Sequence, residues 1–129
     1  HPDVPGSAGK LLSRSDVVEL VSAGADIGSH SMTHPDLRKL DDEQLARELT
    51  ESKELIEDAT QRECSTLAYP FGLYDDRVAS AAQRSGYRIA FAWLPGPWNP
   101  FAAPRLPGPP RHGAFRLAVK MLGFRRPGP

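Results

Sequence analysis

The sequence predicts an α/β fold with a parallel sheet, on three observations. Helix-like and strand-like patterns alternate along residues 14–93, as they do in βαβ units. Residues that cap or end helices stand at the boundaries between these patterns. Hydrophobic residues make up 40% of the chain and charged residues 25%, which is the composition of a folded globular protein rather than a disordered one.

The first predicted helix covers residues 14–23. Ser13 can cap its N-terminus, and its apolar residues repeat at the i, i+3, i+4 spacing of an amphipathic helix. Gly24 stands where a glycine commonly ends a helix. The short apolar segment that follows, residues 25–28, is compatible with a buried strand.

The longest predicted helix covers residues 41–60, and a strand is predicted at 65–69. Asp41 as the N-cap and Gln44 three residues later form the pattern of a capping box. Apolar residues line one face of this helix, while Glu and Lys occupy the other face. The strand that follows ends at a Pro-Phe-Gly bend.

A further helix is predicted at residues 76–85 and a further strand at 87–93. Asp75 can cap this helix and Gly86 can end it. Parallel strands joined through helices have right-handed crossovers, and the helices cover the sheet. Three strands alone make a thin sheet with two open edges, so we expect further strands in a longer protein.

The chain changes character after residue 93. Residues 94–113 are rich in Pro and Gly and are predicted to be irregular. Apolar residues recur at helical spacing at about 114–122, which predicts a last short helix. The final residues are expected to be solvated.

Sixteen basic and sixteen acidic residues give the chain a formal net charge of zero. A balanced chain lacks the positive surface that binds nucleic acid or anionic membranes. No apolar run approaches the ~20 residues that a membrane-spanning helix needs. The partner that we expect is therefore a neutral sugar polymer or a small molecule.

The single cysteine, Cys64, can form no intramolecular disulfide. It also lacks the second cysteine or nearby histidine of a zinc motif, so we expect a small, partly buried residue. The chain opens with His1 in a loop-like stretch and shows no signal peptide. We therefore expect it to begin inside a longer protein.

The strongest chemical signal is the pair His30 and His34, which follows the first predicted strand. Neutral imidazole is the commonest metal ligand among side chains, and two histidines this far apart can meet one ion if their loop is tight. The hydroxyls of Ser31 and Thr33 can bond to backbone groups and hold the turn. Because residues before proline avoid the helical region, Pro35 favours a loop conformation for His34.

Taken alone, a histidine pair with this spacing is more often two surface residues without a metal. Its position changes that balance, because loops at the carboxyl ends of parallel strands form the active sites of many α/β folds. Both interpretations remain open from the spacing alone.

A second signal lies at the same end of the next predicted strand, in residues 67–74. Pro70 and Gly72 bend the backbone there, and a bent backbone can aim an N–H outward, where it can stabilise an oxyanion. Tyr69 and Phe71 can stack on sugar rings. The alternative is a strand end whose aromatic residues belong to the core.

Three segments together resemble the polysaccharide deacetylase family, also called the NodB-homology or carbohydrate esterase 4 (CE4) domain. Residues 27–37, IGSHSMTHPDL, look like the second motif of that family, and residues 68–72, AYPFG, look like the third. Residues 86–90 resemble the segment after the third motif, and the likeness covers about 11–107. The long helix between the motifs has three polar residues at the expected places: Glu48, Ser52 and Lys53.

The resemblance implies a distorted, TIM-like (β/α) barrel with about seven parallel strands. Residues 1–111 would be an incomplete part of this domain that lacks the N-terminal strands, and residues 112–129 would be a C-terminal helix and a disordered tail. The implied reaction is the hydrolysis of N-acetyl, or sometimes O-acetyl, groups on a bacterial glycan such as an N-acetylglucosamine polymer. An extracytoplasmic or cell-envelope location is expected from the resemblance alone.

The resemblance also implies roles for individual residues. His30 and His34 would bind a divalent metal, for which zinc is the first candidate, and the metal would polarise the acetyl carbonyl and orient the attacking water. The backbone N–H of Phe71 would stabilise the oxyanion. Four residues would contact the substrate: Tyr69, Pro70, Phe71 and Trp93.

The chain departs from the family pattern in its acidic residues. The first motif of the family is an Asp-Asp pair that supplies the general base and the third metal ligand. The pairs at 41–42 and 75–76 stand at predicted helix starts, where capping explains them better. We therefore expect the base and the third ligand to lie outside this chain, which would leave it incomplete for catalysis.

Other positions also depart from the pattern. Ala68 replaces an arginine of the third motif, a form that resembles deacetylases of poly-β-1,6-N-acetylglucosamine. The Leu-x-His motif of the general acid is absent, and His112 is expected to be a solvated loop residue. Trp98 could shape the acetyl pocket as well as Trp93 could, but core packing is an equal alternative. Arg105 resembles a recurring C-terminal arginine, and a surface role is equally plausible.

Two other functions remain open from the sequence. The chain could be a non-catalytic glycan-binding module that derives from the same fold. It could also be part of an unrelated α/β protein in which the histidine pair is incidental.

Overall fold

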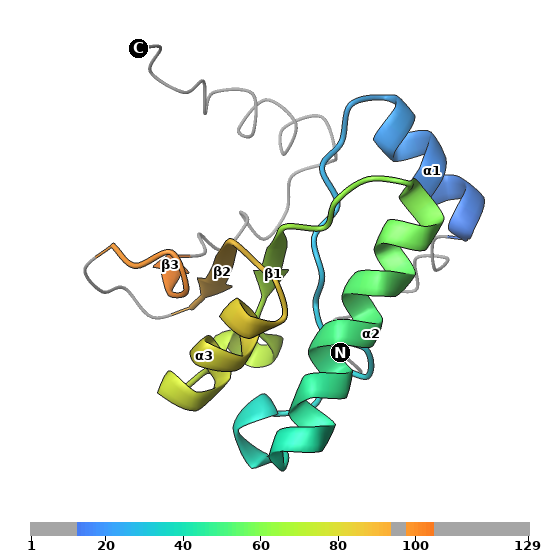
Figure 1. Ribbon diagram of the computed structural model, residues 1–129. Helices are drawn as coiled ribbons and strands as arrows, with labels where there is room; N and C mark the ends of the chain where they lie inside the picture. Colours follow the sequence, from blue (N-terminus) through green and yellow to red (C-terminus); the bar gives the residue numbers. More distant parts are fainter. Residues whose placement is uncertain (1–12, 94–97, 105–129) are drawn as a thin grey trace, which may run out of the picture.

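The computed structural model describes residues 13–93 and 98–104. Its helices, 3-10 turns (η) and strands follow one another along the chain (Figure 1): α1 (Arg14–Ser22), η1 (Leu37–Lys39), α2 (Asp42–Thr60), β1 (Thr66–Ala68), η2 (Pro70–Gly72), α3 (Asp76–Arg84), β2 (Ile89–Ala92) and β3 (Ala103–Pro104). No helix among the described residues is both long and apolar enough to span a membrane. The helix predicted at 114–122, the tail, Arg105 and His112 lie outside the described residues.

The strands form one parallel sheet in the order β1-β2-β3, which confirms the predicted α/β class. Leu67 of β1 lies opposite Ala90 of β2, and Phe91 of β2 lies opposite Ala103 of β3. Helix α2 runs alongside the sheet, and α1 packs near the C-terminal end of α2 (Figure 1). All three strands therefore present their carboxyl ends at the same edge of the sheet.

The helix starts confirm the predicted caps. Ser13 and Asp16 form a capping box at α1, and Asp41 and Gln44 form one at α2. The carboxylate of Asp75 accepts a hydrogen bond from the third residue of α3 at 2.8 Å. These side chains satisfy backbone N–H groups that have no partner within the helix.

The strand predicted at residues 25–28 is wrong. Ser29 alone makes a parallel bridge, in which its N–H donates to the Thr66 carbonyl at 2.9 Å and its carbonyl accepts from the Ala68 N–H at 2.8 Å. Two residues later Ser31 adopts a φ of 65°, which ends the extended backbone. This conformation stops the ladder on the C-terminal side of Ser29, and residues 25–28 on its other side pair with no strand.

The stretch predicted to be irregular contains a short strand. Ala103 and Pro104 pair with the edge of β2, and the carbonyl of Pro100 accepts a hydrogen bond from the Ala90 N–H at 2.7 Å. Proline lacks an N–H to donate, so it is tolerated on an edge strand of this kind. Composition alone did not reveal this pairing, because it depends on a neighbour that is distant in sequence.

The core lies between the sheet and the helices α2 and α3, and Leu37 of η1 joins it. It is built mainly from small and medium-sized residues, of which the largest fully buried one is Tyr69. The principal aliphatic members are Leu37, Leu45, Leu49, Leu67 and Val78. This core fixes the position of α2 relative to the carboxyl edge of the sheet.

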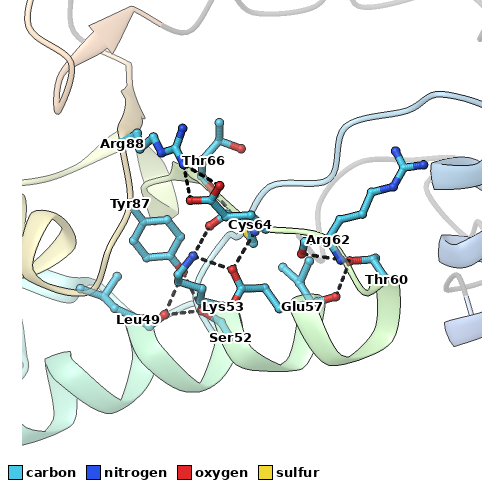
Figure 2. A network of polar contacts seen from close by, with 12 residues as sticks. Leu49, Ser52, Lys53, Glu57, Thr60, Arg62, Cys64, Thr66, Tyr87 and Arg88 are labelled. Atoms are coloured by element: carbon cyan, nitrogen blue, oxygen red, sulfur yellow. Dashed lines mark hydrogen bonds and ion pairs between the residues drawn. The ribbon is translucent and has the colours of Figure 1, made fainter.

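A polar network joins α2 to the segment before β1 (Figure 2). The Lys53 ammonium donates to the Cys64 carbonyl and to the Glu57 carboxylate, at 2.7 Å in each case, and lies 5.6 Å from the centre of the Tyr87 ring. Glu57 also accepts from the Cys64 N–H at 2.9 Å. Cys64 is fully buried rather than partly buried, and its burial raises the pKa of the thiol.

Candidate metal centre

The two histidines of the HxxxH segment converge at the carboxyl edge of the sheet. The Nε2 atoms of His30 and His34 lie 3.2 Å apart, and the two rings meet edge-on at a centroid distance of 4.7 Å. Both residues are exposed. The short distance between the two Nε2 atoms shows that the loop meets the condition for sharing one ion, which is that it be tight.

A hydrogen bond at the opposite side of the His30 ring determines its tautomer. The Nδ1 atom lies 2.7 Å from the carbonyl oxygen of Ala68, the last residue of β1. Since a carbonyl can only accept, Nδ1 has the proton and the neutral ring keeps a lone pair on Nε2. Histidines that bind metal ions commonly donate their other ring N–H to a backbone carbonyl in this way.

The spacing of the two nitrogens fits a shared divalent metal. Ligand nitrogens about 2.0–2.1 Å from a tetrahedral zinc ion are separated by about 3.3 Å, close to the observed separation of the two Nε2 atoms. Residues 13–93 and 98–104 contain no group of three or more His, Cys, Asp or Glu side chains that could hold an ion. The pair thus offers two ligands, and a third would have to come from elsewhere.

The histidine loop uses an unusual backbone. Ser31 has a φ of 65° and His34 a φ of 60°, both in the left-handed region that non-glycine residues seldom adopt. The Ser31 hydroxyl accepts a hydrogen bond from the His34 N–H at 3.1 Å, as predicted for this side chain. The Thr33 hydroxyl bonds to α2 rather than to the backbone of its own loop.

Glu48 of α2 holds the middle of this loop, a role that sequence reasoning did not assign. Its Oε2 atom accepts from the N–H groups of Met32 and Thr33, at 2.8 and 2.9 Å, and its Oε1 atom accepts from the Thr33 hydroxyl at 2.5 Å. Burial alone would raise the pKa of Glu48, but these hydrogen bonds together lower it below its usual value. The sequence offered one indication of this role: Glu48 is an acidic residue that directly precedes Leu49, a buried residue of α2.

The second motif-like segment forms η2 and lies against the histidines. Phe71 adopts a φ of 57°, and its ring meets the His34 ring edge-on at 4.6 Å. Among the described residues, no carbonyl or side chain accepts a hydrogen bond from the Phe71 N–H. Within the described residues this donor thus has no acceptor, and the ring of the same residue lies against His34.

Trp93 reaches the same edge because it directly follows β2. Its N–H donates to the Gly72 carbonyl at 3.2 Å, and its backbone packs so closely on Gly72 that a Cβ at position 72 would lie 2.3 Å from the Trp93 Cβ. The Trp93 side chain is 62% exposed and Phe71 is 44% exposed. Both can present apolar surface to a ligand.

Tyr69 and Pro70, which the sequence analysis expected to contact substrate, lie inside the described part of the chain. Both are fully buried. The Tyr69 ring stacks on Tyr74 at 5.1 Å, its hydroxyl donates to the Phe101 carbonyl at 3.0 Å, and burial raises its pKa. In the described structure the Tyr69 side chain therefore supports the start of η2 through packing and a hydrogen bond.

The remaining sequence candidates lie elsewhere. Asp41 and Asp75 cap helices, and Asp42 pairs with Arg77 at 2.7 Å. Trp98 is 72% exposed, which excludes core packing within the described residues.

Comparison with known proteins supports the resemblance seen in the motifs. A sequence profile of the polysaccharide deacetylase family matches residues 8–90. The chain is 28% identical over 122 residues to a chitooligosaccharide deacetylase of Rhizobium leguminosarum bv. trifolii, and the alignment covers 93% of this chain and 52% of that protein. The chain spans between 30% and 52% of the length of this deacetylase and of two further curated relatives.

Solved structures share the same fold. The polysaccharide deacetylase BC0361 from Bacillus cereus superposes with a TM-score of 0.68 and 30% identity, over 78% of this chain and 33% of that one. BA3943 from Bacillus anthracis, a CE4 family pseudoenzyme, superposes with a TM-score of 0.57 and 26% identity, over 60% of this chain and 27% of that one. The family profile matches well over half of the length of this chain, and the chain therefore belongs to the polysaccharide deacetylase family.

Proposed function

We propose that this chain contributes part of the active site of a metal-dependent hydrolase that removes N-acetyl or O-acetyl groups from a polysaccharide. The observation behind this proposal is the 3.2 Å approach of the His30 and His34 Nε2 atoms, with the opposite side of the His30 ring bonded to Ala68. Membership of the family supports the reaction class. A relative named as a chitooligosaccharide deacetylase supports an acetylated amino-sugar polymer as the substrate.

His30 and His34 would hold the metal through their Nε2 atoms, and zinc is the ion that their chemistry suits best. A bound zinc ion supplies Lewis acidity toward an acetyl carbonyl and lowers the pKa of water. The carbonyl of Ala68 keeps the His30 ring in the tautomer that exposes its Nε2 lone pair.

The Phe71 N–H is the group proposed to meet the oxyanion. It lies in η2 beside His34 and has no acceptor among the described residues. A backbone donor of this kind stabilises negative charge that develops on a carbonyl oxygen, and it needs no rearrangement as the charge appears. The exposed rings of Phe71 and Trp93 offer apolar faces for the acetyl group or a sugar ring.

The proposal requires two groups that the described residues do not provide. A carboxylate must complete the metal site, and a base must activate water, since the caps Asp41 and Asp75 serve α2 and α3. We propose that both come from a longer form of the protein, which would also complete the TIM-like barrel. The chain by itself is therefore expected to bind zinc weakly and to release little acetate.

Zinc titration of the untagged chain by calorimetry tests the metal site. We expect His30→Ala to weaken zinc binding about tenfold or more, because one of two ligands is lost, whereas His112→Ala should leave the affinity unchanged. A longer form of the protein, in which an aspartate completes the metal site at His30 and His34, should release acetate from N-acetylglucosamine oligomers. If that form holds zinc yet releases no acetate from any acetylated glycan, the enzymatic proposal is wrong.

A second candidate is a non-catalytic glycan-binding module. The likeness to a CE4 pseudoenzyme favours it, and the alanine at position 68 is compatible with it. Glycan binding that needs no metal and persists unchanged in His30→Ala would support this alternative over hydrolysis.

A further inference from the structure

Helix α2 holds the histidine loop at two points that are one helical turn apart. Glu48 accepts hydrogen bonds in the middle of the loop, at Met32 and Thr33. Ser52 contacts the start of the loop, where its hydroxyl lies within hydrogen-bond distance of the Ser29 hydroxyl. Positions separated by four residues lie on the same face of a helix. The core residues Leu45 and Leu49 fix that face against the sheet, so the helix is a rigid support for the loop.

The contact at the middle of the loop involves a full carboxylate. The N–H groups of Met32 and Thr33 both donate to one oxygen of Glu48, and the Thr33 hydroxyl donates to the other. Hydrogen bonds to a charged acceptor are stronger than those between neutral groups. Glu48 is half-buried and anchored in the helix, which limits the motion of all three donors.

The contact at the start of the loop is a chain of hydroxyls. The Ser31 N–H donates to the Ser29 hydroxyl at 3.2 Å, and that hydroxyl lies 2.8 Å from the buried Ser52 hydroxyl. Ser52 in turn donates to the Glu48 carbonyl at 2.8 Å, one turn earlier in α2 (Figure 2 shows Ser52 on this helix). The loop is thus tied to α2 before and after its first left-handed residue.

These ties matter because the loop backbone is intrinsically unfavourable. Ser31 and His34 both have positive φ values, which a non-glycine residue keeps only when its surroundings enforce them. Met32 and Thr33, the residues that Glu48 binds, lie between these two positions. Release of the two N–H groups would let the loop relax and the two Nε2 atoms separate.

We propose that Glu48 is a positioning residue that preorganises His30 and His34 for one divalent metal ion. This inference rests on the metal site proposed above. Glu48 does not join the two histidines as a ligand in this arrangement, because the described residues contain no group of three His, Cys, Asp or Glu side chains that could hold one ion. Partners of this kind, one step removed from the metal, typically change metal affinity by about 10- to 100-fold when they are removed.

Cobalt(II) titration of the untagged chain tests this inference, because the visible absorption of cobalt reports both affinity and coordination geometry. We expect Glu48→Ala to weaken cobalt binding about 10- to 100-fold and to change the absorption spectrum. Glu48→Gln should recover part of the affinity, since its amide oxygen can still accept the two backbone N–H groups. Glu51→Ala is the matched control, because Glu51 is an exposed acidic residue of the same helix.

The outcomes separate this inference from the metal site itself. If the wild-type chain binds no cobalt or zinc, the metal site proposal fails. If the wild type binds and Glu48→Ala binds equally well with the same spectrum, the positioning role of Glu48 is wrong. Circular dichroism checks folding. If Glu48→Ala does not fold, the same comparison is made with Glu48→Gln, for which wild-type affinity together with an unchanged spectrum would overturn the inference.

Discussion

Gly72 shows how one residue shapes the candidate site. Its φ of 68° is in the left-handed region, and the Trp93 backbone occupies the space where a side chain would begin. The Trp93 backbone nitrogen would lie 2.8 Å from an added Cβ. Glycine is therefore required at this position for two separate reasons: the left-handed backbone conformation and the close approach of the Trp93 backbone.

We expect Gly72→Ala to lower the free energy of unfolding by about 3 kcal/mol, since it adds overpacking to left-handed strain. Gly24→Ala is the matched control, because Gly24 has a φ of 94° but nothing within 4 Å of an added Cβ. Strain alone should reduce its stability by about 1 kcal/mol. Urea unfolding followed by circular dichroism measures both changes, and equal losses would show that the contact with Trp93 is unimportant.

Helix capping explains why the acidic pairs at residues 41–42 and 75–76 stand where α2 and α3 begin. The Asp41 carboxylate accepts from the Gln44 N–H at 2.8 Å at the start of α2, and Asp75 makes the equivalent contact at the start of α3. A carboxylate in this position satisfies an N–H and also interacts favourably with the helix dipole. These aspartates are accordingly structural rather than metal-binding.

Asp41→Ala and Asp75→Ala should each reduce the free energy of unfolding by about 1 kcal/mol and leave zinc affinity unchanged. Thermal unfolding and zinc titration of the same samples measure the two quantities together. Asp76→Ala serves as the control for Asp75, because Asp76 is exposed and is not the capping residue. A tenfold loss of zinc affinity in either capping variant would instead identify a metal ligand.

Three carboxylates with lowered pKa values, those of Asp36, Glu48 and Glu57, should together control the stability of the whole molecule in acid. Hydrogen bonds from Arg38 lower the pKa of Asp36 to about 2, from an ordinary value of 3.8. The Lys53 hydrogen bond lowers the pKa of Glu57, and the loop hydrogen bonds lower that of Glu48. A lowered pKa in the folded state means that the unfolded chain binds protons more readily.

The stability from these groups should be complete above their unfolded pKa values, near 4.5 for glutamate, and should be lost as pH falls through the folded values. Urea unfolding at pH 7, 5 and 3 measures this loss. Glu57→Gln should make the drop between pH 5 and pH 3 smaller, whereas Glu54→Gln, at an exposed position of α2, should leave it unchanged. Stability that rose on acidification would contradict the assignment.

Helices α1, α2 and α3 and the α/β class of the fold could be predicted from the sequence alone. Caps such as Asp41 with Gln44 act within a few residues, so their outcome can be predicted locally. Strands were less predictable: residues 25–28 looked like a strand but make none, and β3 arose in a stretch rich in proline. A strand needs a partner, and the sequence does not say which distant segment will supply it.

For the candidate site, the sequence and its family resemblance pointed to His30, His34 and Phe71, and required a tight loop between the two histidines. The packing of the folded chain was needed to show that Tyr69 and Pro70 are core residues and that Glu48 holds the loop. The physical reason is that burial and side-chain hydrogen bonds depend on how α2 packs against the sheet. Residue types indicated the chemistry of the histidine pair, whereas its 3.2 Å geometry depends on contacts between segments far apart in the chain.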